Sequence, residues 1–416
     1  MEKLHFGLPT RQIQVCADAR MTPHRIYMDH HATTPVDPRV LEVMLPFFTE
    51  QFGNAGSTSH SFGWDAQEAV DAAQKSISRC IGAASVREVI FTSGATESNN
   101  LAIRGVTQRH RRRGNHIVTV ATEHKAVIDP LRRLERYGFE ITWIKPLPDG
   151  DPSAGLISSH QIADAIRDDT VLVSVMLANN EIGVIQPLDE IGEVCKERDV
   201  LLHTDATQAV GRIAVDVAHL QVDLMSFSAH KVYGPKGIGA LYVRRRSPNV
   251  RLEPQIDGGG QQGGLRAGTL NVAAIVGFAR ALELCSEEMP SEQPRLSKLR
   301  RQLAMGIMEK VAGVELNGPT LDQSSLRLAG NLNLRFGNVD GEALMMSMGN
   351  LAVSSGSACT SANPEPSHVL RAIGLDEDAS RSSLRFGLGR YNTEDDVNRA
   401  VESISDAVSR LRSLST

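Results

Sequence analysis

The chain has 416 residues, of which 41% are hydrophobic, 22% charged and 4% aromatic, and its formal net charge is -5. This composition is typical of a globular protein of two or three domains with a large core. The acidic balance argues against a protein built to bind nucleic acid or an anionic membrane, because both favour a cationic surface. No apolar run approaches the roughly 20 residues that span a bilayer, so we expect no membrane association.

The first residues carry no folding signal. Residues 1–25 contain no apolar stretch of the kind found in secretory signals. They are rich in arginine but also contain Glu2 and Asp18, so an organellar transit peptide is the less favoured alternative. Met21 is a second candidate start. We expect a flexible extension and a cytoplasmic protein, with an organellar matrix as the alternative location.

Five cysteines stand far apart and form no CxxC pair: Cys16, Cys80, Cys195, Cys285 and Cys359. An odd number at long spacings argues against a disulfide framework or a zinc knuckle. We therefore expect free thiols in a reducing compartment and no metal site.

Short apolar runs, several of them rich in β-branched residues, predict strands at 89–91, 116–120, 171–176, 200–202, 224–227 and 238–243. Segments of helical length separate them, such as 188–198. This alternation predicts βαβ units and a largely parallel sheet. In such sheets the functional loops lie beyond the carboxyl ends of the strands.

The pattern changes after about residue 285. Residues 287–303 are charged and predict a helix, and 331–335 alternate with the period of a half-buried strand. Thr393 and Asp396 resemble a capping box. An apolar helix face then follows at Val397, Val401, Ile404, Val408 and Leu411.

These patterns divide the chain into three parts. We expect an N-terminal extension at 1–25, a large domain at 26–285 whose first residues pack on the small domain, and a smaller C-terminal domain at 286–416.

The run Ser-Gly-Ala-Thr-Glu at 93–97 follows a predicted strand and opens a predicted helix. Glycine lets the backbone approach a ligand, and a helix N-terminus offers N–H groups to an anion. The hydroxyl of Thr96 adds a further donor. An ordinary helix N-cap is the alternative, and this segment alone does not decide between them.

Asp205 and Lys231 end two successive predicted strands. A buried carboxylate needs a partner, and a protonated pyridine nitrogen would serve and keep that ring an electron sink. A lysine here could form a Schiff base with an aldehyde cofactor. The alternatives are a cap for a helix near 207–210 and an exposed loop lysine. With the Gly94 turn, the two residues supply partners for the ring, aldehyde and phosphate of one cofactor.

Cys359 lies among small hydroxyl residues in the run 353–364. Little apolar packing can fix such a loop, which suits a nucleophile that swings towards a substrate. A buried small hydrophobe is the alternative for any cysteine. We favour that alternative for Cys80, Cys195 and Cys285, whose settings are helical and apolar.

Two further residues are candidates. Arg385 lies in a strand-like run, and its guanidinium could hold a substrate carboxylate through two hydrogen bonds. A surface arginine is the alternative. His124 could stack on a ring or carry a proton, although alone it indicates little.

Together these segments resemble the cysteine desulfurases of the class V aminotransferase family. The matching runs keep their order from about residue 26 to 412: 27–34, 92–97, 122–125, 179–183, 205–208, 226–235, 266–269, 354–361 and 383–390. The resemblance implies an α/β fold of the pyridoxal-phosphate-dependent, aspartate-aminotransferase-like type. In that fold a large, mostly parallel-sheet domain is joined to a smaller α+β C-terminal domain.

The resemblance also implies the cofactor contacts. Lys231 resembles the Schiff-base lysine, Asp205 the partner of the pyridine nitrogen, and His124 the histidine stacked on the ring. The ring oxygen and the phosphate would be bound by Asn180, Gln208, Ala95, Thr96, Ser228 and His230. Thr269 resembles the residue that reaches the phosphate across a dimer interface, which implies a homodimer.

The implied reaction converts L-cysteine to L-alanine. Arg385 and Asn180 would bind the substrate, and Cys359 would carry the sulfur as a persulfide to an iron–sulfur or tRNA-thiolation acceptor protein. Cys359 could also contact an iron–sulfur cluster transiently. Ala55 and Ala229 depart from the proline and glycine of many relatives, and both look tolerable. The alternatives are a selenocysteine lyase or another enzyme with this cofactor, and a non-catalytic sulfur-transfer scaffold.

Overall fold

The computed structural model describes residues 25–246, 249–323, 325–355 and 366–414. Cys16, Cys359 and nearly all of the proposed N-terminal extension lie outside these ranges. Within them, no helix combines the length and the apolar character needed to cross a bilayer.

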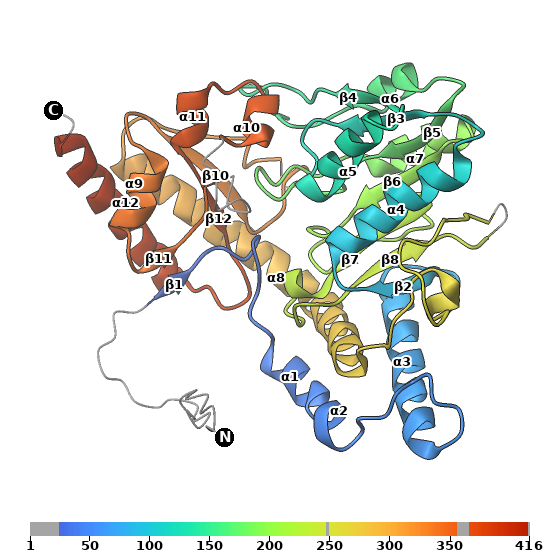
Figure 1. The fold of residues 1–416 in the computed structure, drawn as a ribbon. Helices are drawn as coiled ribbons and strands as arrows, with labels where there is room; N and C mark the ends of the chain where they lie inside the picture. Colours follow the sequence, from blue (N-terminus) through green and yellow to red (C-terminus); the bar gives the residue numbers. More distant parts are fainter. Residues whose placement is uncertain (1–24, 247–248, 324, 356–365, 415–416) are drawn as a thin grey trace, which may run out of the picture.

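A seven-stranded sheet forms the larger layer, in the order β2-β8-β7-β6-β5-β3-β4 (Figure 1). Its strands are β2 (Val89–Thr92), β3 (His116–Val120), β4 (Glu140–Ile144), β5 (Thr170–Ser174), β6 (Leu201–Asp205), β7 (Leu224–Ser228) and β8 (Gly239–Val243). β8 runs antiparallel to both of its neighbours, β2 and β7, and the other strand pairs of this sheet are parallel. The predicted largely parallel sheet is confirmed, although β4 at the edge was not predicted.

Helices cover both faces of this sheet. Successive residues of a strand point to opposite faces, so each apolar strand supplies side chains to a core on either side. Phe91 and Val118 face one core, whereas Ile90 and Ile117 face the other. The first core is covered by α1 (Pro38–Met44), α3 (Ser61–Cys80), α7 (Leu188–Glu197) and the start of α8 (Val272–Lys310). The second is covered by α4 (Ala95–His110) and α5 (Lys125–Glu135). Double coverage explains why most of these strands are buried at every position.

The long helix α8 runs from the seven-stranded sheet to a second, smaller sheet (Figure 1). Its first half packs Ile275, Phe278 and Leu282 into the first core, and its last part packs Leu303 and Ile307 into another. The helix predicted at 287–303 is therefore confirmed, but it begins much earlier, at Val272. The helix starts before residue 287 because its apolar residues at 272–285 form a continuous buried face.

The smaller sheet is antiparallel, in the order β12-β10-β9. Its strands are β9 (Val314–Leu316), β10 (Asn331–Phe336) and β12 (Ser383–Gly387), and α9 (Gly341–Ser347) and α12 (Glu394–Leu414) pack nearby. The capping box before α12 is confirmed. The Thr393 amide donates to Asp396 Oδ2 at 2.9 Å, and the Asp396 amide donates to Thr393 Oγ1 at 3.1 Å.

Short elements complete the fold. β1 (Ile26–Tyr27) pairs in parallel with β11 (Leu351–Ala352), so the first described strand lies beside the C-terminal part. The remaining helices are α2 (Pro46–Thr49), α6 (Ser159–Ala165), α10 (His368–Ala372) and α11 (Glu377–Arg381), with 3-10 turns at Val86–Glu88, Ala229–Lys231 and Gln262–Gly264.

Candidate functional site

A cavity of about 520 Å³ opens at the carboxyl ends of β6 and β7. This volume falls within the roughly 300–1,000 Å³ usual for small-molecule sites. Its lining gathers every predicted site residue except Thr269 and Cys359: Ala95, Thr96, His124, Asn180, Asp205, Gln208, Ser228, His230, Lys231 and Arg385. Segments far apart in the sequence therefore form one site.

The N-terminus of α4 points at this cavity without a side-chain cap. Gly94 occupies the N-cap position with φ 155°, a conformation that favours glycine. A Cβ on Gly239 of β8 would lie 2.6 Å from the Gly94 Cα, so the two backbones approach closely. Gly94 thus serves as the N-cap of α4 through its backbone alone, and no side chain caps this helix end. The helix dipole and the lining hydroxyls suit an anion such as a phosphate.

One carboxylate at this helix end forms an ion pair with an arginine. Glu97 accepts hydrogen bonds from Arg266 Nε at 2.8 Å and from the Ser93 amide at 2.8 Å. These contacts lower the pKa of Glu97 against the opposing effect of burial. Glu97 therefore stays ionised, with its charge balanced by Arg266 beside the proposed phosphate position.

Asp205 ends β6 as a buried carboxylate. Its Oδ2 accepts from Asn99 Nδ2 at 2.7 Å, and its Oδ1 accepts from the Thr207 amide at 2.9 Å. Among the described residues no cationic side chain forms an ion pair with it. A buried carboxylate without a cation fits the protonated ring nitrogen of pyridoxal phosphate. The alternative cap for a helix at 207–210 is wrong, because the chain forms turns there.

Beneath Asp205 lies a polar network that the sequence did not reveal. His203 contacts the Ser174 hydroxyl through Nδ1 at 2.9 Å and the Ser226 hydroxyl through Nε2 at 3.1 Å. Burial lowers the pKa of His203 to about 4, with Asp205 opposing the shift. His203 is therefore neutral at physiological pH and adds no charge next to Asp205.

Lys231 follows β7 in a short 3-10 turn. Its Nζ donates to the carbonyl oxygens of His31 and Ala32, at 2.6 Å each. The lysine thus projects into the cavity, and the alternative of an exposed loop lysine is wrong. Neighbouring His230 contacts the Thr33 hydroxyl at 3.1 Å. Burial and the nearby Lys231 lower the pKa of His230 to about 4, so its ring is neutral.

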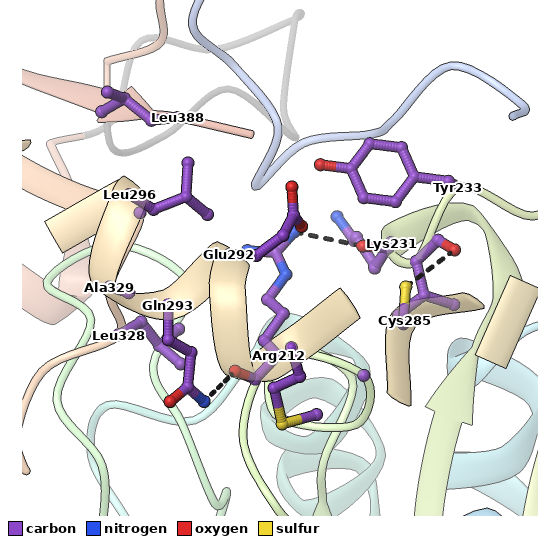
Figure 2. A pocket seen from close by; sticks show the side chains of 14 residues that line it. Arg212, Lys231, Tyr233, Cys285, Glu292, Gln293, Leu296, Leu328, Ala329 and Leu388 are labelled. Atoms are coloured by element: carbon purple, nitrogen blue, oxygen red, sulfur yellow. Dashed lines mark hydrogen bonds between the residues drawn. The ribbon is translucent and has the colours of Figure 1, made fainter. Parts of the chain in front are cut away.

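A second, small pocket of about 40 Å³ is lined in part by Lys231 (Figure 2). Figure 2 shows Arg212 reaching the Lys231 carbonyl oxygen, at 3.2 Å. Cys285 lines the same pocket and donates to the Val232 carbonyl at 3.5 Å. Burial raises the pKa of Cys285 to about 11, so it is a protonated, unreactive thiol as expected for a buried small side chain.

His124 forms the N-cap of α5. Its Nδ1 accepts from the Ala126 amide at 3.0 Å, so in the neutral ring the proton sits on Nε2. The preceding residue, Glu123, is fully buried and accepts from the Met176 amide at 2.6 Å. Burial raises the pKa of Glu123 well above its usual value. Two hydrogen bonds therefore hold His124 at the cavity: the one from the Ala126 amide to its ring, and the one that anchors the preceding residue, Glu123, to Met176.

Arg385 lies in β12 and is only 3% exposed, so the alternative of a surface arginine is wrong. One Nη donates to Asp29 Oδ1 at 2.9 Å and the other to the Asn180 carbonyl at 3.2 Å. In the described part of the chain its buried Nε has no hydrogen-bond partner. An unpaired guanidinium N–H at the cavity suits a carboxylate ligand.

Two predicted site residues do not join the cavity. Thr269 is exposed and lines a different hollow, together with Gln262 and Leu270. Cys359 lies outside the described residues. The structure also adds residues that sequence reasoning missed, namely Asp29, His31, Glu181 and His203. In the sequence, these residues could be noticed only as polar side chains within apolar runs or within the runs that resemble the family.

Comparisons with known proteins give a consistent result. The aminotransferase class-V family model matches residues 26–400. The cysteine desulfurase IscS of Aeromonas hydrophila is 54% identical over 392 residues, and that of Anaeromyxobacter dehalogenans is 52% identical over 392, each covering 94% of both chains. A solved NifS-like protein has a TM-score of 0.84 and 36% identity, covering 93% of this chain and all of its own. A structure titled SspA in complex with cysteine has a TM-score of 0.75 and 36% identity, covering 88% and 100%.

Proposed function

The chain belongs to the class V aminotransferase family, and we propose from this premise that it is a pyridoxal-phosphate-dependent cysteine desulfurase. It converts L-cysteine to L-alanine and passes the sulfur to Cys359 as a persulfide. The observation that carries the proposal is one cavity lined by the Lys231 amine, the Asp205 carboxylate and Arg385. Within the described residues no cation pairs with Asp205, and Nε of Arg385 has no hydrogen-bond partner.

Bound pyridoxal phosphate supplies an electron sink for negative charge at the α-carbon of an amino acid. Asp205 would hold the protonated ring nitrogen and keep that sink strong. The N-terminus of α4 with Ser228 and His230 would bind the phosphate, and Asn180 and Gln208 would bind the ring oxygen. His124 would contact the ring. Each of these roles is a proposal that follows from the residue's chemistry and its place in the cavity lining.

Arg385 orients the substrate by its carboxylate. The backbone of β12 fixes the arginine, Asp29 and the Asn180 carbonyl hold its two Nη atoms, and Nε remains for the ligand. Lys231 Nζ then accepts the proton from the α-carbon of the cysteine. His124 donates a proton to the substrate through Nε2, the ring nitrogen that does not form the cap of α5.

Sulfur leaves the substrate by attack of the Cys359 thiolate on the cysteine sulfur. The new S–S bond forms as the C–S bond breaks, and its electron pair stays with the substrate carbon, which a proton converts to alanine. The product is a persulfide on Cys359, so no external oxidant is needed. We propose an iron–sulfur scaffold or a tRNA-thiolation relay protein as the acceptor, and the cytoplasm as the compartment.

Replacing Arg385 with lysine is expected to raise the KM for cysteine about 10- to 100-fold, because a charge-assisted hydrogen bond contributes about 1.5–3 kcal/mol. The kcat is expected to change much less. Steady-state alanine release across a range of cysteine concentrations measures both. Arg381→Lys is the matched control, since Arg381 is exposed on α11 and forms an ion pair with Glu377 of the same helix. An unchanged KM in the Arg385 variant would assign the carboxylate to another group.

We also propose a homodimer. A set of large apolar side chains on α1, α2 and α3 and in the loops between these helices is 43–63% exposed: Leu41, Leu45, Phe48, Phe52, Phe62 and Trp64. These residues fall within one stretch of the chain, 41–64, and exposed aromatic side chains are enriched at interfaces. Thr269 is exposed as well, as its proposed contact with the partner's phosphate requires.

The dimer is tested by sedimentation equilibrium, which should give twice the chain mass. Phe48→Glu should shift the equilibrium to monomer and lower activity, because it would bury a charge in the interface. Tyr137→Glu, at an exposed aromatic residue beyond α5, is the control that should stay dimeric. A native protein that sediments as a monomer would overturn this proposal.

The desulfurase function is tested by the absorbance of the purified protein before and after cysteine is added. We expect a cofactor band near about 400 nm that changes with cysteine, and alanine formed together with sulfide in the presence of a reducing thiol. A protein that stays colourless with added pyridoxal phosphate would overturn the proposal. We further propose that residues 26–285 and 286–416 are the large and small domains.

A further inference from the structure

The turn at 179–183 joins the two halves of the site. It lies beyond β5 and places Asn180 in the cavity lining. Asn179 shapes the turn, because its Oδ1 accepts from the amides of Glu181 at 2.8 Å and Ile182 at 2.9 Å. The whole turn is largely buried, so its position is set by its neighbours.

Residues of the smaller sheet bind the backbone of this turn. The Glu181 carbonyl accepts from Asn331 Nδ2 at 3.1 Å and from Asn333 Nδ2 at 3.2 Å. The Asn180 carbonyl accepts from Arg385 at 3.2 Å. The proposed substrate-binding arginine and the proposed cofactor contact are thus held through a single turn.

The carboxyl group of Glu181 binds the start of α10. The Ser367 hydroxyl donates to Glu181 Oε2 and accepts from the Leu370 amide at 3.2 Å, as the N-cap of that helix. A hydroxyl has one proton to donate, and Ser367 commits it to Glu181. In the sequence, Ser367 lies just beyond the segment that contains Cys359.

The other flank of that segment is attached to the same group of residues. Ser354 pairs with Arg385 through the backbone, with hydrogen bonds of 3.2 Å from the Ser354 amide and 2.7 Å from the Arg385 amide. On the Ser367 flank, His368 Nε2 also contacts the Glu123 carbonyl at 2.8 Å. Both flanks of the Cys359 segment are therefore attached next to the cavity.

We propose that Glu181 is a positioning residue for sulfur transfer: its carboxylate fixes the Ser367 flank of the Cys359 segment relative to Asn180 and Arg385. This inference rests on the proposed desulfurase function. Glu181 itself touches neither cofactor nor substrate in this proposal. It acts by fixing the position of Ser367, which follows the Cys359 segment in the sequence.

The charge of Glu181 depends on groups from three elements. Ser367 of α10, Arg385 of β12, and His124 and Lys125 at the start of α5 all favour its anion. Burial opposes them and dominates, which raises the pKa of Glu181 to about 7. Glu181 therefore loses its proton over the physiological pH range. In the anion both carboxyl oxygens can accept the hydrogen bond from Ser367, whereas in the acid one oxygen carries a proton of its own.

This charge destabilises the fold, which argues for a role in function. The pKa of Glu181 is higher in the folded chain than its ordinary 4.5, so folding disfavours the anion. The resulting decrease in the free energy of unfolding is absent at low pH, grows as the pH rises from about 4.5 to about 7, and is complete above that pH. Replacing Glu181 with glutamine removes this cost, so the variant should be at least as stable as the native protein at pH 8.

The test is Glu181→Gln in the full-length holoenzyme. We expect persulfide formation on Cys359 in a single turnover to slow about 10- to 100-fold, the effect of a small misplacement of a reacting group. The KM for cysteine should change less than about threefold. The rise in rate around pH 7 that depends on Glu181 should be absent from the variant's pH profile. Ser367→Ala should slow the same step, and the double variant should be no slower than the worse single variant.

Glu190→Gln is the matched control. Glu190 also accepts a serine hydroxyl, from Ser159 at 2.9 Å, but it is exposed on α7. A rate equal to native in both glutamine variants would overturn the inference. So would a loss in the Glu181 variant that comes with a lower melting temperature and loss of bound cofactor, because that result means a purely structural role.

Hydrogen exchange in the cofactor-free protein gives a readout independent of activity. The amides at the start of α10 should exchange faster in Glu181→Gln and Ser367→Ala than in the native protein, and no faster in Glu190→Gln. Unchanged exchange in the first two would overturn the proposed contact. Native protein that forms no alanine would instead overturn the desulfurase function, so the two failures are distinguishable.

Discussion

Replacing Lys231 with alanine is expected to reduce alanine formation from cysteine by about 10³-fold or more, because one side chain both binds the cofactor and moves the substrate proton. Lys231 Nζ is the amine held by the carbonyls of His31 and Ala32 in the cavity. Fold stability should change little, since the residue sits in a short turn whose backbone Arg212 holds. Alanine release by the purified variant, reconstituted with pyridoxal phosphate, measures the effect.

The control for this experiment is Lys236→Ala. Lys236 is an exposed cation that lines the same cavity, so it tests whether positive charge alone matters. We expect it to retain activity within about tenfold, as for a single exposed charge. Substantial turnover by the Lys231 variant would assign the proton transfer to a different base, with His124 as the first candidate.

Replacing Cys359 with serine is expected to abolish persulfide formation and to lower alanine release by about 10³-fold, because an alcohol is a far weaker nucleophile than a thiolate. Mass spectrometry after a single turnover with cysteine should find the added sulfur on Cys359 in the native protein and on no residue in the variant. Sustained sulfur release by the serine variant would contradict the covalent role.

The three cysteines in the described part of the chain provide the controls. Burial raises the pKa of Cys195 to about 12 and that of Cys285 to about 11, and burial also raises the pKa of Cys80. All three should remain protonated and unmodified at pH 8. Cys80→Ser, in the half-buried last turn of α3, should therefore form persulfide at the native rate.

Much of the larger sheet could be predicted because its strands are short apolar runs between clear breaks. The prediction for 116–120 matches β3, and the other predicted strands lie within a few residues of those observed. β4 was missed because it is an edge strand with an exposed Glu140 and only one fully buried residue, Ile144. Periodicity identifies a strand only when burial imposes a pattern on it.

The site could be predicted where its residues follow the ends of strands. Asp205 and Lys231 were identifiable in this way, because the ends of neighbouring parallel strands meet at one edge. The environment of Arg385 was not predictable, since it depends on Asp29, which lies 356 residues away in the sequence. The role proposed for Glu181 depends in the same way on Ser367, at a separation of 186 residues.

The helix α8 has a consequence for how the molecule unfolds. One helix contributes Phe278 and Leu282 to the core of the larger sheet and Leu303 and Ile307 to that of the smaller. A fragment ending at residue 285 would cut this helix. It would also separate Ile26 and Met28 from the core of the smaller sheet and leave both in water, at a cost of about 1.5–3 kcal/mol for each. Neither half should therefore express as a stable fragment, and the two cores should melt as one cooperative unit.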